Sequence, residues 1–338
     1  MRRRVLVAAL FFDPGAAAIA WQAPPPDLPY RDHPSMTLSS DGSQGSLMPA
    51  RATSAAAALV AALALTGCSA GNDSSGDGPA LDPSDDPGIA HVHGLGVDPA
   101  DGVLYAATHF GLFALPEEGT ATRIADRFQD TMGFTVVGPN TFLGSGHPDF
   151  RKDPELPPRL GLIRSTDAAK TWESVSLSGD VDFHALHNAD GKIYGWDAGS
   201  SRLMLSADGG KTWDTRSALG LRDFVVSAAD SEVLLATTEK GLARSDDGGR
   251  TFTAVPDAPA LAVLSWQKSD EVYGLDPSGV VYASADGGRS WEERGTVGGE
   301  PEALASHDED LYAAATGRGV LASSDGGRTW TVRYSETG

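Results

Sequence analysis

The sequence predicts an all-β protein, a six-bladed β-propeller whose blades are four-stranded antiparallel sheets. The first observation is a repeat. Five octets share the pattern Ser-x-Asp-x-x-x-Thr/Ser-Trp/Phe, and their aspartates lie 41, 39, 39 and 39 residues apart, at Asp167, Asp208, Asp247, Asp286 and Asp325. The second is that each repeat has room for four short strands. The third is the content of 40 Gly and 21 Pro in 338 residues, which favours tight turns. A period near forty with four strands per unit is typical of a propeller.

One repeat shows the expected order of elements. Strands are predicted over 223–227 and 232–237, with a turn between them. A third strand over 241–244 leads into the octet, and a fourth follows over 251–255. The second strands carry a large residue at one equivalent place, which we interpret as a core packing position: Tyr105, Phe142, Tyr194, Leu235, Tyr273 and Tyr312.

The octets are predicted to be turns between the third and fourth strands. A short Asp side chain hydrogen-bonds nearby backbone amides, and glycine supplies positive φ. The first octet has Ala168 and Ala169 where the others have glycine, so we expect a strained turn there. The unit over 131–175 contains the first octet, and one further unit over 91–124 has none, so the count is six blades within residues 88–338.

The N-terminal region is predicted to lie outside the propeller. Residues 48–67 have the length of an export signal, with an apolar run over 55–65 that is too short to span a bilayer. Residues 1–47 are then best explained as a misassigned leader, and the polar, acidic stretch 68–87 as a flexible tether. Leu65-Thr-Gly-Cys68 resembles the bacterial lipobox. The resemblance implies lipidation at Cys68 and an extracytoplasmic protein anchored to the cell membrane.

Charge and cysteine content exclude several classes of function. The formal net charge is −20, and such an acidic surface repels phosphate backbones, so we expect no nucleic-acid partner. The single cysteine excludes an intrachain disulfide and a zinc site built from cysteines.

Candidate ligand-binding residues gather at one predicted end of the propeller. This mouth is the end at which the first strands of the blades begin and the second strands end. The residues that map to it as ligand-binding candidates are His91, His93, His109, His147, His184, Asp197 and Arg222. Imidazole and carboxylate groups that converge could bind a divalent metal ion, for which His91, His93 and His184 are the candidates. An organic ligand, a glycan, or a polar rim without a ligand are the alternatives.

Acidic residues near the same mouth are candidates for catalysis. Asp149 lies in an unusually long, Gly- and Pro-rich loop over 144–159, and long loops in compact domains are often functional. Asp182 and Asp223 stand at the starts of two first strands. A pair of carboxylates is the catalytic group of most glycoside hydrolases.

The octets resemble the Asp-box, or BNR repeat, of sialidases, and the chain resembles sialidase-like bacterial lipoproteins that are often labelled glycosyl hydrolases. The resemblance implies a propeller, and in the family the boxes lie opposite the usual active site. The Arg-Ile-Pro motif of true sialidases has no match, and Arg123-Ile-Ala only echoes it. The arginines that map to the rim could form a clamp like the sialidase arginine trio, but the sequence does not place three of them together: Arg151, Arg159, Arg222 and Arg318. Three functions remain open: ligand or metal binding at the mouth, glycoside hydrolysis, and protein docking on the acidic rim.

Overall fold

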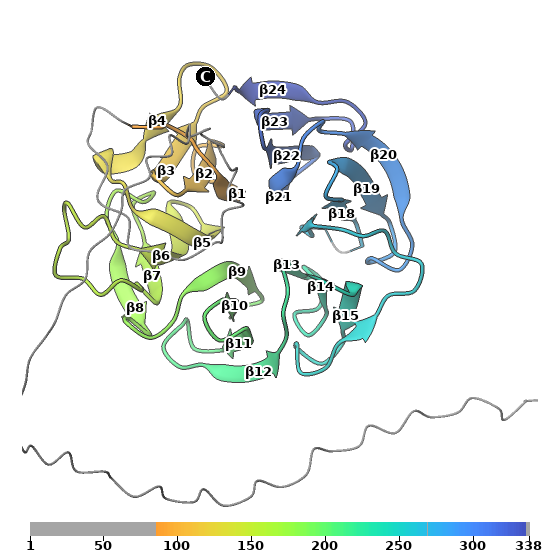
Figure 1. The fold of residues 1–338 in the computed structure, drawn as a ribbon, viewed down its shortest axis with the longest axis horizontal. Helices are drawn as coiled ribbons and strands as arrows, with labels where there is room; N and C mark the ends of the chain where they lie inside the picture. Colours follow the sequence, from red (N-terminus) through yellow and green to blue (C-terminus); the bar gives the residue numbers. More distant parts are fainter. Residues whose placement is uncertain (1–85, 269, 336–338) are drawn as a thin grey trace, which may run out of the picture. The chain divides into compact units, whose positions relative to one another are not determined.

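The computed structural model describes residues 86–268 and 270–335, and these residues form a ring of six four-stranded antiparallel sheets (Figure 1). The predicted fold is confirmed. The leader, the signal segment, Cys68 and the tether up to residue 85 lie outside the described residues. Within the described part of the chain, no helix has the length and apolar character needed to cross a membrane.

Each of the first three blades is formed by consecutive strands. Blade 1 contains β1 (Val92–Val97), β2 (Leu104–Thr108), β3 (Gly111–Leu115) and β4 (Thr122–Arg123), followed by the short 3-10 helix Ile124–Asp126. Blade 2 contains β5 (Asp130–Gly138), β6 (Thr141–His147), β7 (Leu162–Ser165) and β8 (Glu173–Ser176). Blade 3 contains β9 (Phe183–Ala189), β10 (Lys192–Asp197), β11 (Arg202–Ser206) and β12 (Asp214–Ala218).

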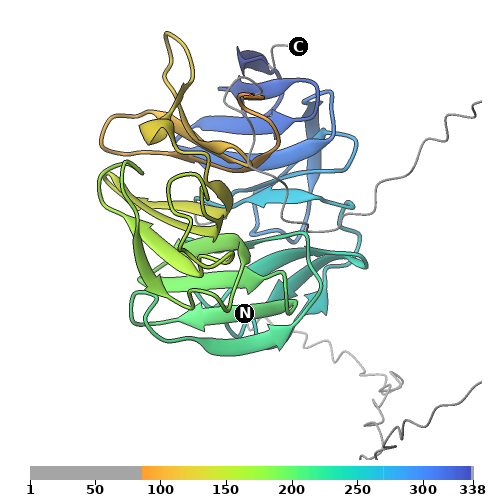
Figure 2. The ribbon, with the colours of Figure 1, turned by 60° about the vertical axis from the view of Figure 1, so that its left-hand side comes forward.

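The last three blades follow the same order. Blade 4 contains β13 (Asp223–Val226), β14 (Leu234–Thr238), β15 (Gly241–Ser245) and β16 (Thr253–Ala254). Blade 5 contains β17 (Val263–Ser265), β18 (Val272–Leu275), β19 (Val280–Ser284) and β20 (Glu292–Thr296). Blade 6 contains β21 (Pro301–His307), β22 (Asp310–Ala315), β23 (Gly319–Ser323) and β24 (Thr331–Tyr334). The first strand of every blade is innermost, and the stacking of the sheets is visible from the side in Figure 2.

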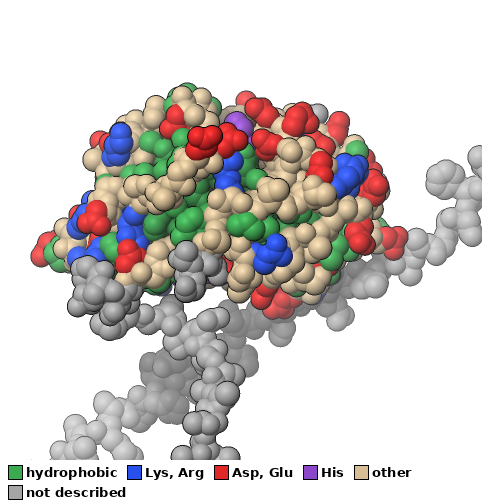
Figure 3. Space-filling model, turned by 90° about the horizontal axis from the view of Figure 1, so that it is seen from above, with side chains coloured by type: hydrophobic (Ala, Val, Ile, Leu, Met, Phe, Trp, Pro, Cys, Tyr) green, Lys and Arg blue, Asp and Glu red, His purple; other side chains and the backbone are tan. Residues whose placement is uncertain are grey.

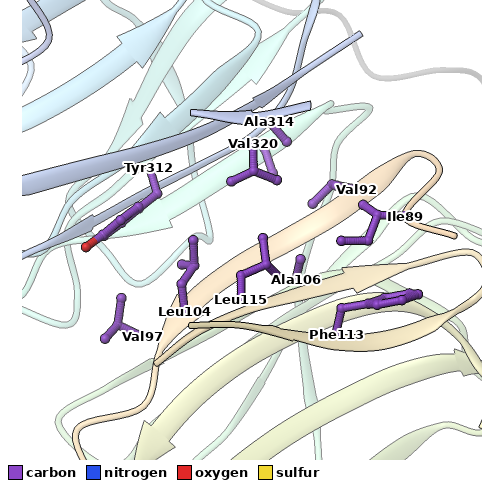
Figure 4. Packing of buried hydrophobic residues seen from close by; sticks show 11 residues of the cluster. Ile89, Val92, Val97, Leu104, Ala106, Phe113, Leu115, Tyr312, Ala314 and Val320 are labelled. Carbon is purple, nitrogen blue, oxygen red and sulfur yellow. The ribbon is translucent and has the colours of Figure 1, made fainter. Parts of the chain in front are cut away.

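Contacts between blades 1 and 6 close the ring without any exchange of strands. The inner strands β1 and β21 lie next to each other, and the Val92 amide donates to Oε2 of Glu302 at 2.8 Å. Between the two sheets lies an apolar cluster in which Leu104 and Val320 are fully buried (Figure 4). Burial of such side chains stabilises a fold by about 1.5–3 kcal/mol each. A closed ring also leaves few exposed sheet edges.

The predicted packing position is confirmed in all six blades. The large residues of the second strands are all buried, with relative exposures from 0% to 9%, and they fill the spaces between neighbouring sheets: Tyr105, Phe142, Tyr194, Leu235, Tyr273 and Tyr312. The hydroxyl of Tyr194 donates to the Ser231 carbonyl at 2.7 Å, which satisfies the one polar atom of this buried side chain.

The octets form the tight turns between the third and fourth strands, as predicted. In blade 4, Ser245 Oγ donates to Oδ1 of Asp247 at 2.8 Å, and the two Asp247 oxygens accept from the amide and hydroxyl of Thr251. Gly248 and Gly249 follow with φ of 69° and 80°. In the first octet Ala168 and Ala169 adopt φ of 56° and 64°, a conformation that costs an L-residue about 1–2 kcal/mol. The expected strain is therefore present.

The octet aspartates are expected to make the fold sensitive to acid. Hydrogen bonds from Thr251 and Ser245 lower the pKa of Asp247 to about 2, and the pKa values of Asp208, Asp286 and Asp325 are lowered by the same kind of contacts. Because the folded pKa lies below the unfolded one, the stabilisation is present above pH 4 and is lost as the pH falls towards 2. Thermal unfolding from pH 6 to pH 2 measures this loss.

An Asp247→Asn variant provides the test of this acid sensitivity. It should be less stable than wild type at pH 6, and the difference should shrink as the pH falls. Glu118→Gln changes an exposed carboxylate in the turn after β3, and its stability should change with pH as that of wild type does. If the stability of both variants changed with pH in parallel with wild type, Asp247 would not be a source of the acid sensitivity.

Candidate functional site

The mouth of the propeller is built from irregular starts of the inner strands. The pairing register between the first and second strands shifts by one residue at the mouth end of four blades. A β-bulge of this kind re-aims the extra side chain and is common beside functional sites. The extra residues are His93, Met132, His184 and Glu302. Three of these four carry groups that bind metals.

Three histidines meet in blade 1. His91 precedes β1 with φ of 46°, His93 is the bulged residue, and His109 follows β2. One ring nitrogen from each lies within 4.8 Å of the other two. The His93 side chain is only 9% exposed, whereas those of His91 and His109 are 54% and 40% exposed. The cluster therefore has a buried base and an open outer side.

Asp130, the first residue of β5, completes this cluster from blade 2. Nε2 of His93 lies 3.1 Å from Nδ1 of His109, which in turn lies 3.1 Å from Oδ2 of Asp130. Nε2 of His93 is also 3.5 Å from Oδ1 of Asp130, a buried atom without a hydrogen-bond partner. Ligand atoms bound tetrahedrally at ~2.1 Å from one ion lie ~3.4 Å apart. The contacts of 3.1–3.5 Å among the His93 nitrogen, the His109 nitrogen and the Asp130 carboxylate are thus close to the spacing within a coordination shell.

Electrostatics in the cluster favour the neutral form of His93 and the charged form of Asp130. Burial lowers the pKa of His93, against the opposing pull of Asp130. Burial would raise the pKa of Asp130, but contacts with His109 and His93 outweigh it and bring the pKa to about 2. Neutral imidazole and ionised carboxylate are the forms that bind metals.

Glu302 supports the cluster from blade 6. Its carboxylate accepts from the Val92 amide at 2.8 Å and the Thr316 hydroxyl at 3.1 Å, and it lies 3.6 Å from Nδ1 of His91. The contact with Glu302 is the main cause of a raised pKa of His91. Burial would raise the pKa of Glu302, but contacts with His91 and the Val92 amide outweigh it and lower that pKa. Carboxylates placed behind histidines in this way fix ring orientation at metal sites.

A second set of predicted residues meets between blades 2 and 3. Asp182 lies directly before β9, and its Oδ2 is 3.1 Å from Nε2 of His184 and 3.6 Å from Nε2 of His147. The predicted metal set is therefore divided. His91 and His93 lie with His109, whereas His184 lies with Asp182 and His147.

Two other candidates serve local structure. Asp149 is buried and accepts from the Arg151 guanidinium at 2.9 and 3.0 Å and from the Phe128 amide at 2.9 Å, so it organises the long loop. Asp197 accepts from the amides of Asp182 and Gly199 and from the Ser200 hydroxyl, and so shapes the turn after β10.

Asp223 and Arg222 connect blades. The Asp223 carboxylate accepts from the amides of Phe224 in its own blade and Leu264 in blade 5, each at 2.8 Å. Arg222 donates to the Pro301 carbonyl of blade 6 at 2.8 Å and lies 3.7 Å from Glu300. Arg222 therefore reaches from blade 4 to blade 6 on the mouth side.

Asp130 is a site residue that the sequence prediction omitted, and Glu302 is another. Asp130 precedes the first strand predicted for blade 2, just as Asp182 precedes that of blade 3 and Asp223 opens that of blade 4. An alignment of these first-strand starts is the signal that would have identified Asp130.

Comparisons with known proteins support a propeller and give one glycoside hydrolase relative. No family model matches the chain. A xyloglucanase from Paenibacillus sp is 28% identical over 156 residues, which are 44% of this chain and 15% of the xyloglucanase. The chain thus spans a small part of that relative's length.

Solved structures show the same fold at low identity. A gluconolactonase from Xanthomonas campestris superposes with a TM-score of 0.53 at 13% identity, over 67% of this chain and 84% of its own. A chain of a nidogen–laminin complex superposes with a TM-score of 0.50 at 14% identity, over 65% of this chain and 88% of its own. Likeness at this level concerns the fold alone.

Proposed function

We propose that this protein is a lipid-anchored extracytoplasmic propeller that binds a divalent transition-metal ion at its mouth, and binds a small ligand or glycan through that ion. The ion would be held by His91, His93, His109 and Asp130. The single observation that carries the proposal is the spacing of 3.1–3.5 Å among His93 Nε2, His109 Nδ1 and the Asp130 oxygens. Anchoring would come from lipidation of Cys68, as the lipobox-like motif suggests.

The donor set favours a late first-row ion. Imidazole suits Zn²⁺, Cu²⁺, Ni²⁺ and Fe²⁺, whereas Mg²⁺ and Ca²⁺ prefer shells made of oxygen. One carboxylate partly balances the ion's charge in a half-buried position. The exposure of His91 and His109 leaves the outer side of the ion accessible, as in metal sites that bind substrates rather than only stabilise a fold.

Replacement of His93 by alanine is expected to weaken Zn²⁺ binding at this site more than about 100-fold, because even residues behind the ligands contribute 10–100-fold. Isothermal titration of the EDTA-treated full chain measures the effect. His307→Ala removes a histidine at the far end of β21 and should bind as wild type does. Absence of binding, or equal affinity in His93→Ala, would overturn the proposal.

Glycoside hydrolysis is the second candidate, and the xyloglucanase relative is the observation that favours it. Of the three carboxylates predicted for catalysis, Asp182 is the one with an oxygen that is buried without a hydrogen-bond partner. Turnover of xyloglucan or aryl glycosides that persists in EDTA and disappears in Asp182→Asn would favour this function over metal-mediated binding. An acidic surface, part of which is seen in Figure 3, leaves protein docking as a third function without a specific contact to support it.

A further inference from the structure

We infer that the mouth holds a second divalent cation, between His147 and Asp182 and His184 of blades 2 and 3. The inference deepens the proposed function, because it makes the ligand-binding centre a pair of neighbouring cation sites. It is carried by the hydrogen-bonding pattern of these three side chains and by their position relative to the first site.

The tautomer of His147 is fixed by the backbone. Nδ1 of His147 lies 2.6 Å from the carbonyl oxygen of Pro158. A carbonyl oxygen only accepts, so Nδ1 carries a proton and donates it, and the neutral ring then has its lone pair on Nε2. Metal-binding histidines are typically held in this way, with the other ring nitrogen donating to a carbonyl or carboxylate.

That lone pair faces a carboxylate, which also only accepts. Nε2 of His147 lies 3.6 Å from Oδ2 of Asp182, and Nε2 of His184 lies 3.1 Å from the same oxygen. A proton on Nε2 of His147 or a metal ion between the two atoms satisfies both acceptors. A metal ion fits here because the same carboxylate oxygen also lies beside Nε2 of His184, which adds a third donor.

Asp182 itself has unused coordinating capacity. Its side chain is only 11% exposed, and its Oδ1 is buried without a hydrogen-bond partner. A buried carboxylate oxygen without a partner is costly, and bound ions are one of the ways in which proteins satisfy such atoms. The two imidazoles are 35% exposed, so an ion can reach the carboxylate from solvent.

The backbone of blade 2 places the second site next to the first. His147 is the direct pairing partner of Asp130 in the β5–β6 ladder. Asp130 belongs to the first site and His147 to the second, so the two sites follow one another along the mouth from blade 1 to blade 3. The bulge in β9 puts His184 into the second site in the same way that the β1 bulge puts His93 into the first.

The donor sets predict an order of filling. The first site offers three imidazoles and a carboxylate, and the second offers two imidazoles and a carboxylate. We therefore expect the first site to bind Zn²⁺ more tightly, and the second to keep more coordination positions open for a ligand.

Titration of the metal-free full chain with Zn²⁺ tests the inference, with Co²⁺ absorption as a spectroscopic readout. Wild type should bind two equivalents. Asp182→Asn and His184→Ala should each bind the tighter Zn²⁺ equivalent as wild type does and bind the other equivalent more than about 100-fold more weakly. His93→Ala should lose the tight equivalent, and His307→Ala should keep both.

The outcomes separate this inference from the proposed function. One equivalent in wild type, or two equivalents unchanged in both Asp182→Asn and His184→Ala, would overturn the second site and show that Asp182 shares only protons with its histidines. Normal binding of the tight equivalent in His93→Ala would instead overturn the first site. If Asp182→Asn does not fold, the half-exposed His184→Ala alone decides the result.

Discussion

Wild-type protein is expected to lose about 3 kcal/mol of stability relative to Asp223→Asn as the pH rises from 4 to 8. Burial raises the pKa of Asp223 to about 7, and the amides of Leu264 and Phe224 and the charge of Arg222 only partly oppose it. A folded pKa near 7 against an unfolded value of about 3.9 corresponds to about 4 kcal/mol. The residue keeps some contact with solvent, which screens the charge and lowers this figure.

The sign follows from where the proton is bound. Between pH 4 and pH 7 the folded protein keeps a proton on Asp223 that the unfolded chain releases, so stability is full below pH 4 and is lost as the pH rises through 7. Denaturant unfolding of both proteins in EDTA, over a series of pH values, gives the difference, and contributions of the histidines cancel in it. A difference that does not change with pH would contradict the assignment.

Gly146→Ala is expected to cost about 3 kcal/mol and to weaken the first metal site. Gly146 precedes His147 in β6 and pairs with Thr131, the residue after Asp130, and it has φ of 135°, a region that L-residues rarely adopt. An added Cβ would lie 2.2 Å from the Asp130 carbonyl oxygen and 2.9 Å from the Met132 amide nitrogen. Because both atoms belong to the backbone, the start of β5 must move, and backbone strain adds to overpacking.

Gly138→Ala provides the matched control for this variant. Gly138 ends β5, the strand whose start faces Gly146, and an added Cβ at Gly138 meets no atom within 4 Å. Its effect should stay within about 0.5 kcal/mol. Denaturant unfolding and Zn²⁺ titration of the two variants are the measurements, and equal effects would show that the mouth of blade 2 is not held as described.

The fold could be predicted because the repeat fixes it. The octets identify the turn between third and fourth strands, and their spacing leaves room for only one order of strands. Even blade 1, whose third strand is followed by the turn Pro116-Glu-Glu-Gly rather than an octet, is recognisable from its strands. Lengths were less predictable: the fourth strand of blade 4 is reduced to Thr253–Ala254, because strand ends depend on pairing with neighbours.

The site could be predicted only as a region. Mapping strand ends to one mouth brought His91, His93 and His109 together, because topology alone determines which ends are neighbours. The bulges, which decide where His93 and His184 point, arise from pairing between strands and leave no fixed trace in residue spacing. For the same reason the division of the histidines into two sets follows from the three-dimensional pairing of the strands and not from their order in the sequence.

Local hydrogen bonds also redirected some carboxylates. The long loop predicts that Asp149 lies at the mouth, yet Arg151, two residues later, donates hydrogen bonds to both of its carboxylate oxygens. Asp130 was missed because a strand start predicted one residue too late left it outside the blade. The contact of Asp149 depends on side-chain geometry that a spacing argument does not contain, whereas Asp130 needed only a better strand boundary.

Anomalous diffraction at the zinc absorption edge, from crystals grown with Zn²⁺, tests the metal-centre proposal most directly. We predict a peak about 2.0–2.2 Å from His93 Nε2, His109 Nδ1 and an Asp130 oxygen. A structure with Zn²⁺ in the medium and no anomalous peak among His91, His93, His109 and Asp130 would contradict the account.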